Sequence, residues 1–390
     1  MANPRSDHAP GHRRRLLIVH ASSDLYGSDV ACLRVAAAAR AAQWEVDIVV
    51  PSDGPLVPAS RAVGATVVVL DPIVLRHADL SGVRPLLLPA RWLRQSLRLR
   101  AFARSRPAYD VVHSNCAPTL GGALVARWSG ARHVWYVHEL FTSTLQRRVF
   151  DYLLCRYADA VITCSRAALD QFPGVVRAGH GHVGYARVDV PDEIERSKPL
   201  SGGVPVVVCV GRLNSWKGQD VLIAAIARLR SRGVAVRAQL VGSVFRDERQ
   251  FEQRLRDLVE ELGVGDVVDF LGERRDALDI VAEADIAVIP STRPEPFGMS
   301  VVEAMALGRP VVASAAGGPA EIISSGIDGL LVPPGDAVAL ADALQRLIES
   351  PEFAREIGAH AVSRAGDFTG AQATNKVLEV YADVLARGRA

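Results

Sequence analysis

The sequence lacks the features that mark several large classes of protein. Its 390 residues include five cysteines and no CxxC pair, so neither a disulfide framework nor a cysteine-rich zinc site is indicated. No hydrophobic run reaches transmembrane length, and the apolar run 16–19 that follows the basic start is too short for a signal peptide. We therefore expect a cytoplasmic protein whose cysteines are reduced and mostly buried.

Extremes of charge are missing as well. The formal net charge is +2, with 49% hydrophobic and 23% charged residues, a composition that argues against disorder and against a fibrous repeat. A charge this small indicates no nucleic-acid partner. The sequence also contains no Asp-x-Asp pair, so a metal-chelating site has no obvious ligands and we expect no metal.

Short apolar runs alternate with helical patterns along the whole chain. This alternation is typical of βαβ units around a parallel sheet, and it occurs in two series. A chain of 390 residues is also longer than one core usually supports, so we expect an α/β protein with two domains. The expected strands are 16–20, 46–50, 66–70, 111–113, 134–137 and 160–164 in the first series, and 206–210, 238–241, 267–271, 286–290, 310–313 and 329–332 in the second.

The stretch 190–205 separates the two series, because it is rich in Pro, Gly, Ser and charge and has no apolar periodicity. We expect a polar tail over 1–13, a first Rossmann-like domain over 14–190, a second over 200–365 and a C-terminal helix over 366–390. That last helix could cross back onto the first domain.

The first candidate site follows the run 206–210, where the chain reads Gly211-Arg212-Leu213-Asn214-Ser215-Trp216-Lys217-Gly218 before an apolar helix. Glycines let a backbone approach an anion closely, an arginine binds phosphate bidentately and a lysine adds a point charge. The loop therefore suits a diphosphate. The alternative is an ordinary surface loop with solvated charges.

The second candidate site follows the run 286–290 and extends from Glu295 to Pro310, and a third piece, Gly317-Gly318-Pro319-Ala320-Glu321, follows the next strand. Amides near Gly298 would begin a helix and face a phosphate, and Glu303, one turn inside, suits vicinal hydroxyls. Glu295 would then face a sugar. The alternative is that both glutamates are ordinary residues of a solvated helix start.

Together these pieces resemble the retaining glycosyltransferases of family 4, the glycosyl transferases group 1, which have the GT-B fold. The resemblance covers nearly the whole chain and implies two Rossmann-like domains whose parallel sheets face each other across a cleft, the first for the acceptor and the second for a nucleotide sugar. It rests on Gly211-Arg212 with Lys217-Gly218, on the E-x7-E pair Glu295 and Glu303, and on Gly317-Gly318 with Glu321.

The resemblance also implies roles for single residues. Arg212 and Lys217 would hold the donor diphosphate, Glu303 the ribose and Glu295 the transferred sugar. Backbone groups near the helix start and in the first loop would line the donor, namely those of Gly211, Phe297, Gly298 and Met299.

Two further pieces of the first domain match the family. Tyr26-Gly27-Ser28 lies where the family has a glycine-rich loop near the donor, with Ser28 in place of the usual second glycine. His138 matches a histidine that hydrogen-bonds the donor sugar, although the alternative is a histidine satisfied within its own loop. The family's Asn-Gly-Val-Asp before the linker reads Ala186-Arg187-Val188-Asp189 here.

The resemblance thus implies a hexosyltransferase that acts on a glycan, lipid-linked or small-molecule hydroxyl with retention of configuration. It needs no cofactor beyond the nucleotide diphosphate sugar, and GDP-mannose, UDP-glucose and UDP-N-acetylglucosamine all remain open as donors. The alternatives are an inactive nucleotide-sugar-binding protein and a GT-B epimerase. A related phosphorylase would need a pyridoxal-phosphate lysine, for which the sequence offers no recognisable context.

Two other features of the sequence allow competing interpretations. The tract 179–184 matches G-x-G-x-x-G, but no clear strand precedes it and no apolar helix follows, so it is a weak dinucleotide signal. The segment 84–106 has seven arginines and no acid, with apolar residues at helical spacing. It is either a helix that lies on an anionic membrane or an ordinary domain helix with a basic solvated face.

Overall fold

The computed structural model describes residues 13–75, 84–191, 194, 200, 202–244, 249–369 and 371–387, so nearly all of the expected polar tail lies outside the described residues. The chain divides into two compact units. The first comprises the chain up to Cys164, Ala168–Gly184 and the end from Thr374, and the second comprises Ser165–Ala167 and Tyr185–Ala373.

The first unit is built on one parallel sheet with the order β3-β2-β1-β4-β5-β6-β7. Because β1 and β4 are neighbours although β2 and β3 follow β1 in the chain, the strand order reverses between them. Nearly every residue of the central strands is buried, as expected for a parallel sheet covered on both faces. The strands are β1 (Arg15–His20), β2 (Glu45–Val50), β3 (Thr66–Val69), β4 (Val111–Asn115), β5 (Arg132–Val137), β6 (Ala160–Thr163) and β7 (Gly181–Val183).

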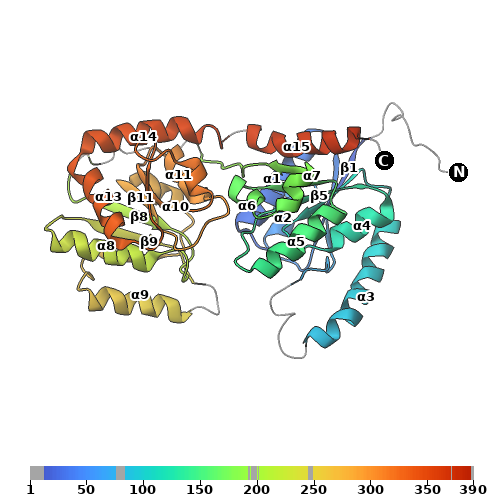
Figure 1. Ribbon diagram of the computed structural model, residues 1–390, viewed down its shortest axis with the longest axis horizontal. Coiled ribbons are helices and arrows are strands. Elements are labelled where there is room, and N and C mark those ends of the chain that lie inside the picture. The colour runs from blue at the N-terminus through green and yellow to red at the C-terminus, as the bar shows by residue number, and fades with distance from the viewer. Residues whose placement is uncertain are drawn as a thin grey trace. The chain divides into compact units, whose positions relative to one another are not determined.

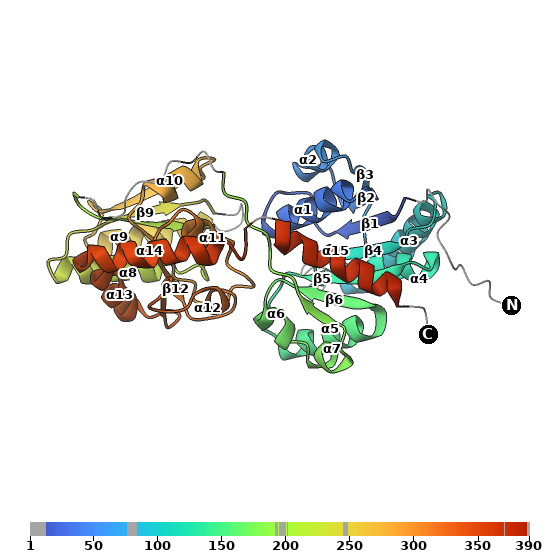
Figure 2. The same ribbon diagram turned by 90° about the horizontal axis from the view of Figure 1, so that it is seen from above.

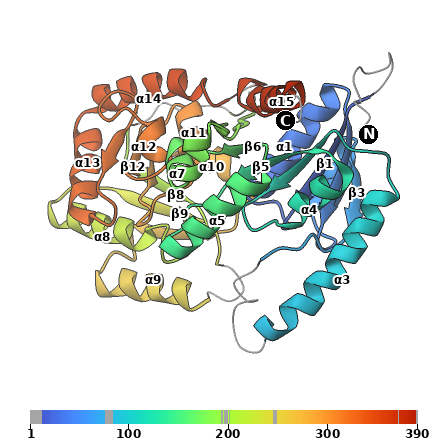
Figure 3. The ribbon, with the colours of Figure 1, turned by 45° about the vertical axis from the view of Figure 1, so that its right-hand side comes forward.

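Helices cover both faces of this sheet. Two apolar clusters lie on the face that carries Val112 and Trp135: one packs α3 and α4 against β1 and β4, and the other packs α5 and α7 against β5 and β6. The opposite face carries His113 and is covered by α15. Helix α3 lies beside α4, as Figure 3 shows. The helices are α1 (Gly27–Ala41), α2 (Leu56–Ala62), α3 (Arg84–Arg104), α4 (Gly121–Ser129), α5 (Thr144–Tyr157), α6 (Arg166–Asp170), α7 (Pro173–Ala178) and α15 (Ala371–Ala386). The first residues of α6 and of α15 are counted with the second unit.

The second unit repeats the plan with a parallel sheet of order β10-β9-β8-β11-β12-β13. Helices α8, α9 and α13 cover one face, and α10, α11 and α14 cover the other (Figure 1). Its strands are β8 (Val206–Val210), β9 (Arg237–Val241), β10 (Val268–Gly272), β11 (Ile286–Ile289), β12 (Val311–Ser314) and β13 (Leu330–Val332). Its helices are α8 (Gln219–Ser231), α9 (Arg249–Glu261), α10 (Ala277–Glu283), α11 (Met299–Ala306), α12 (Pro319–Ile322), α13 (Ala337–Glu349) and α14 (Pro351–Ala365).

The last helix, α15, packs in the first unit, where Figure 2 shows it lying over the strands. The hydroxyl of Tyr381 lies 2.7 Å from Nδ1 of His113 on β4, and the Tyr381 ring lies 5.7 Å from that of Trp44. Tyr381 and Val380 are fully buried. The end of the chain therefore completes the core of the unit in which the chain began.

The sequence analysis predicted the α/β architecture with two Rossmann-like parallel sheets, and the structure confirms it. It missed one strand, β7, which lies inside the G-x-G-x-x-G tract 179–184. This strand pairs in parallel with β6 at the edge of the first sheet, and α7, which precedes it, ends at Gly179 with a φ of 71°. The glycine pattern here therefore marks a helix end and an edge strand, and it does not form a phosphate-binding turn.

Candidate functional site

The candidate site of the second unit lies at the carboxyl end of its sheet. The loops that follow β8 and β11 come from neighbouring strands, and the strand order reverses between these two. In open parallel sheets the crevice at such a reversal is where ligands bind. The two loops that the sequence singled out thus leave the sheet at the same point.

The loop after β8 is held in shape by its own polar residues. Asn214 accepts hydrogen bonds through Oδ1 from the backbone of Trp216 and Lys217, at 3.2 and 3.0 Å. The fully buried Gln219 donates to the backbone carbonyl of Arg212 at 2.9 Å. The loop therefore presents an exposed arginine and a lysine from a fixed turn.

The side chain of Lys217 contacts the loop after β11. Its Nζ lies 2.8 Å from Oε1 of Glu295, whose side chain is only 6% exposed, and Ser291 donates a hydrogen bond to the same oxygen. The ammonium also lies 4.7 Å from the centre of the Trp216 ring. A cation and a carboxylate are therefore held together at the reversal point, where an anionic ligand would compete with Glu295 for Lys217.

Helix α11 begins directly beside this pair. Gly298, its N-cap, has a φ of 105°, a conformation that side chains rarely adopt, and it aims the first turn of the helix, which starts at Met299. Amides of a first turn have no partner within their helix and suit an anion. Glu303 lies one turn further on and lines, with Ser300, a cavity of about 150 Å³ between α10, α11, β8 and β11.

Gly317 and Gly318 lie where the loop after β12 meets the loop after β11. A Cβ on Gly318 would lie 1.9 Å from the carbonyl oxygen of Phe297, and one on Gly317 would lie 2.2 Å from that of Glu295. The amide of Gly318 also donates to the Glu295 carbonyl at 2.8 Å. These two glycines therefore let one loop pack against the other, whereas the space around Gly211 is open except for the Lys217 side chain at 3.7 Å.

Glu321, which the sequence analysis grouped with these glycines, is engaged elsewhere in the second unit. Its carboxylate accepts hydrogen bonds from the backbone of Arg166 and Ala167, at 2.8 and 2.6 Å. Tyr185 lies beside it, with its hydroxyl 3.5 Å from the same carboxylate. The acid thus anchors the segment Ser165–Ala167 in the second unit.

In the first unit, His138 and the Gly27 loop lie at the carboxyl end of the sheet, and both contact a residue that the sequence analysis missed. Asn115 ends β4; its Oδ1 lies 3.0 Å from Nε2 of His138, and its Nδ2 donates to the carbonyl of Ser28 at 3.0 Å. The signal that was overlooked is a polar residue at the end of a buried strand next to the reversal point. Burial, with His113 and His20 nearby, lowers the pKa of His138 to about 3.

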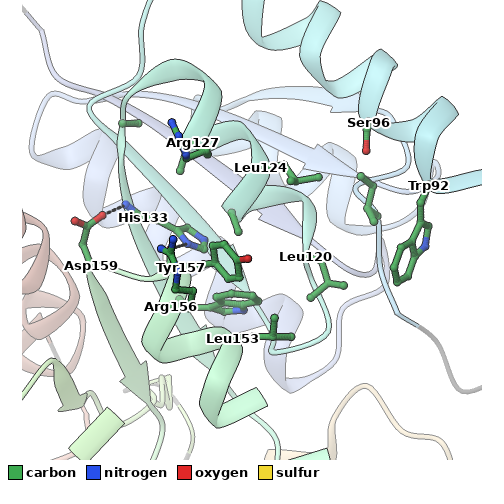
Figure 4. Close-up of a pocket in the computed structure, with 15 residues that line it drawn as sticks. Trp92, Ser96, Leu120, Leu124, Arg127, His133, Leu153, Arg156, Tyr157 and Asp159 are labelled. Carbon is green, nitrogen blue, oxygen red and sulfur yellow. Dashed lines mark hydrogen bonds between the residues drawn. The ribbon is translucent and has the colours of Figure 1, made fainter. Parts of the chain in front are cut away.

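Another cavity, in the first unit, lies away from these residues. Its volume is about 450 Å³, and it opens between α3, α4 and α5, near the start of β5. Figure 4 shows Trp92, Leu120 and Leu153 on its apolar side, with Arg127 and Arg156 among its polar residues. It is therefore separate from the carboxyl end of the sheet.

The described parts of the chain offer little for metal binding, for spanning a membrane or for cysteine chemistry. There, no three His, Cys, Asp or Glu side chains are grouped so that they could hold a metal ion, and no helix is long and apolar enough to span a bilayer. None of the five cysteines forms a disulfide, and all but Cys155 are buried. Burial raises the pKa of the Cys209 thiol, close to Lys217, to about 12.

Both halves of the chain are similar to known glycosyltransferases. Residues 191–364 match the glycosyl transferases group 1, and residues 26–186 match the glycosyl transferase 4-like domain. A D-inositol 3-phosphate glycosyltransferase of Stackebrandtia nassauensis is 30% identical over 320 residues, which are 74% of this chain and 72% of the relative. The putative glycosyltransferase EpsD of Bacillus subtilis is 28% identical over 70% of this chain and 76% of its own length.

Among solved structures, that of HepE from Anabaena in complex with UDP and glucose is similar to this chain. It has a TM-score of 0.79 and 25% identity, covering 95% of this chain and 100% of HepE. The same protein has also been crystallised with UDP-glucose, and that structure is 26% identical to this chain with a TM-score of 0.78. The likeness extends over both units.

Proposed function

The chain belongs to the glycosyl transferases group 1, a family of enzymes, and we propose that it transfers a hexose from a uridine diphosphate sugar. The acceptor is a hydroxyl of a glycan, a lipid-linked glycan or a small molecule, and the anomeric configuration is retained. The observation that carries the proposal is the pairing of Lys217 with Glu295 beside the start of α11, at the reversal of the sheet. The complexes of HepE with UDP and UDP-glucose support uridine as the base.

In the proposed complex the diphosphate binds between Arg212, Lys217 and the first amides of α11. Glu303 accepts hydrogen bonds from the ribose, and Glu295, released from Lys217 by the phosphates, accepts from the sugar. As the bond between sugar and phosphate breaks, negative charge grows on the departing diphosphate. Both cations then bind it more strongly than they bind the ground state, which is what accelerates transfer. No side-chain nucleophile and no cofactor enter the proposal.

Product analysis tests this function against its alternatives. The protein is incubated with UDP-hexoses and a panel of acceptors, and the products are identified by mass spectrometry and by the anomeric signals of the new glycoside. Transfer with retained configuration is expected. Epimerised UDP-sugar without glycoside would indicate an epimerase, and unchanged UDP-sugar with every acceptor would contradict the transferase proposal.

We extend the proposal to metal independence, because the sequence has no Asp-x-Asp pair and no three His, Cys, Asp or Glu side chains are grouped for a metal ion among the described residues. Activity is measured before and after exhaustive chelation, with chelated enzyme then resupplied with Mg²⁺ or Mn²⁺. Unchanged activity is expected throughout. A loss of transfer that either cation restores would contradict it.

We also propose that the enzyme works in the cytoplasm at the inner face of a membrane, which it contacts through α3. Leu93 and Leu97 lie one turn apart on this helix and are 63% and 59% exposed. Arg94 and Arg98 beside them are exposed as well. An apolar strip flanked by arginines suits an anionic lipid surface. Of the basic segment 84–106, the side chains of residues 84–87 lie outside the part that the structure describes.

Helix α5 presents a similar surface on the other side of the 450 Å³ cavity. Leu145, Val149 and Tyr152 are 71%, 44% and 65% exposed and follow one another at helical spacing, with Arg148 and Arg156 exposed between and after them.

Co-sedimentation with phosphatidylglycerol vesicles is expected for the wild type and strongly reduced for Leu93→Ser/Leu97→Ser. Equal binding to phosphatidylcholine vesicles, or no binding to either, would contradict this surface.

A further inference from the structure

A continuous chain of buried hydrogen bonds runs through the first unit beneath His138. Asp29 lies 2.6 Å from Nε2 of His20, and Nδ1 of His20 lies 2.9 Å from Nδ2 of Asn115. Asn115 Oδ1 lies 3.0 Å from His138 Nε2 and 3.3 Å from His113 Nε2. All of these groups except the His138 ring are fully or almost fully buried.

The direction of each bond in this chain follows from the orientation of the Asn115 amide. One end of the amide faces the backbone carbonyl of Ser28 at 3.0 Å. A carbonyl only accepts, so this end must be the NH2 group, and the opposite end must be the oxygen. The same NH2 group faces His20 Nδ1, which must therefore be unprotonated, and the other ring nitrogen of His20 donates to Asp29.

The oxygen of Asn115 then determines the state of His138. An amide oxygen only accepts, so His138 must carry its proton on Nε2 in order to form the 3.0 Å bond. The imidazole is neutral, since burial keeps its pKa near 3. A neutral ring with one proton on Nε2 presents a bare lone pair on Nδ1, and the structure records no partner for that atom among the described residues.

The second branch of the chain reaches the C-terminal helix. His113 donates through Nε2 to the same Asn115 oxygen, and its Nδ1 must then accept from the hydroxyl of Tyr381, 2.7 Å away. Burial lowers the pKa of His113 to about 3, so this ring is neutral as well. The three histidines and the tyrosine thus share one consistent set of protons with Asn115 at its centre.

We propose that Asn115 is a positioning residue that fixes His138 as the Nε2-protonated tautomer, so that Nδ1 accepts a hydrogen bond from a hydroxyl of the transferred sugar. Because Nδ1 of this tautomer only accepts, His138 favours a substrate group that donates a hydrogen bond. Only the identification of that group as a sugar hydroxyl rests on the proposed function. A sugar analogue with fluorine at this position, which accepts weakly and cannot donate, is rejected. Asn115 also joins the Gly27 loop, through Ser28, to the same histidine.

The tautomer is measured directly, without any substrate, by nitrogen NMR of protein labelled in histidine. His138→Gln identifies the His138 signals by their loss. One protonated and one unprotonated ring nitrogen are expected between pH 6 and 8, with the proton on Nε2 and no titration in this range. Protonation on Nδ1, or a doubly protonated ring, would overturn the proposal.

Two variants separate positioning from folding. Asn115→Leu removes the acceptor, and the His138 signals are expected to shift toward a mixture of tautomers. Asn115→Asp keeps an oxygen toward His138, and His138 is expected to keep its Nε2 proton in this variant. If Asn115→Leu folds and leaves the tautomer of His138 unchanged, Asn115 does not fix it.

The specificity is measured with UDP-hexoses in which each sugar hydroxyl in turn is replaced by fluorine or by hydrogen. For one position both replacements should lower kcat/KM of the wild type about tenfold or more, and the loss should vanish in His138→Ala. A fluorine that restores activity relative to hydrogen would show that His138 donates, which overturns the proposal. If no UDP-hexose is turned over, the proposed function fails while the NMR result still decides the tautomer.

Discussion

Replacing Lys217 with methionine removes the cation of the candidate site and keeps most of its bulk. In the folded protein Glu295 would lose its partner at 2.8 Å, and with its side chain only 6% exposed it would keep the hydroxyl of Ser291 as its hydrogen-bond donor. Breaking a buried ion pair costs about 3–5 kcal/mol. Lys217 is itself 19% exposed, so we expect a loss of about 2 kcal/mol in the free energy of unfolding.

Lys217→Met is also expected to slow catalysis, independently of its effect on the free energy of unfolding. Removing one charged or hydrogen-bonding group that stabilises a developing anion typically costs about a hundredfold to a thousandfold in rate. We therefore expect kcat/KM of Lys217→Met to fall by about this factor, and Lys217→Arg to retain more activity because it keeps the charge. Initial rates of UDP release with a fixed acceptor measure both variants, and urea unfolding measures stability.

A double-mutant comparison distinguishes a catalytic lysine from one that only neutralises Glu295. In the Glu295→Gln background the carboxylate charge is gone, so adding Lys217→Met should cost little further stability. If Lys217 binds the diphosphate, that same addition still lowers kcat/KM about a hundredfold. Equal activity of Glu295→Gln with and without Lys217→Met would refute the reasoning.

The remaining predictions concern packing and acid stability. Gly318→Ala would force a Cβ to 1.9 Å from the backbone oxygen of Phe297, in the loop after β11, so we expect lost UDP binding in calorimetry together with a lower Tm. Gly265→Ala, whose Cβ would meet its nearest neighbour at 3.7 Å, serves as the control and should leave both unchanged. Arg309 is 2% exposed and donates a hydrogen bond to the backbone carbonyl of Ala284 at 2.8 Å. Arg309→Met should therefore lower the free energy of unfolding by about 1–3 kcal/mol without changing KM. A change in KM alone would contradict a structural role for Arg309. Burial lowers the pKa of His113 to about 3 and that of His133 to about 4. Because both pKa values are lower in the folded than in the unfolded chain, unfolding takes up protons below about pH 6.5. The free energy of unfolding should therefore fall by about 1 kcal/mol per pH unit for each histidine between pH 6.5 and 4. A Tm that stays constant over that interval would exclude this.

Much of the fold was predictable because parallel sheets leave a clear signal. Central strands buried on both faces read as continuous apolar runs, such as Val206–Val210, and each was found where it was expected. β7 was missed because it is a three-residue edge strand with two histidines and a glycine, none of them fully buried. Such a strand has too few apolar residues to show a pattern.

The candidate site was predictable in part. Residues in the loops at strand ends, such as Lys217 and Glu295, were predicted from loop position and family pattern, and the structure places these two in contact. The role of Gly317 and Gly318 was not predictable, because whether a glycine faces a ligand or another loop depends on tertiary contacts. Asn115 was missed for the same reason, since its partners lie far away in the sequence, at Ser28 and His138.

The central claim is that the second unit binds a nucleotide sugar through its predicted donor residues. Calorimetric titration of the full chain with UDP and with UDP-hexoses is carried out for the wild type, Lys217→Met, Glu303→Gln and the control Gly265→Ala. We expect UDP to bind the wild type, Lys217→Met and Glu303→Gln to weaken the binding at least tenfold, and Gly265→Ala to bind as the wild type does. Equal affinity of all four proteins for UDP, or no binding of any nucleotide to the wild type at millimolar concentration, would contradict it.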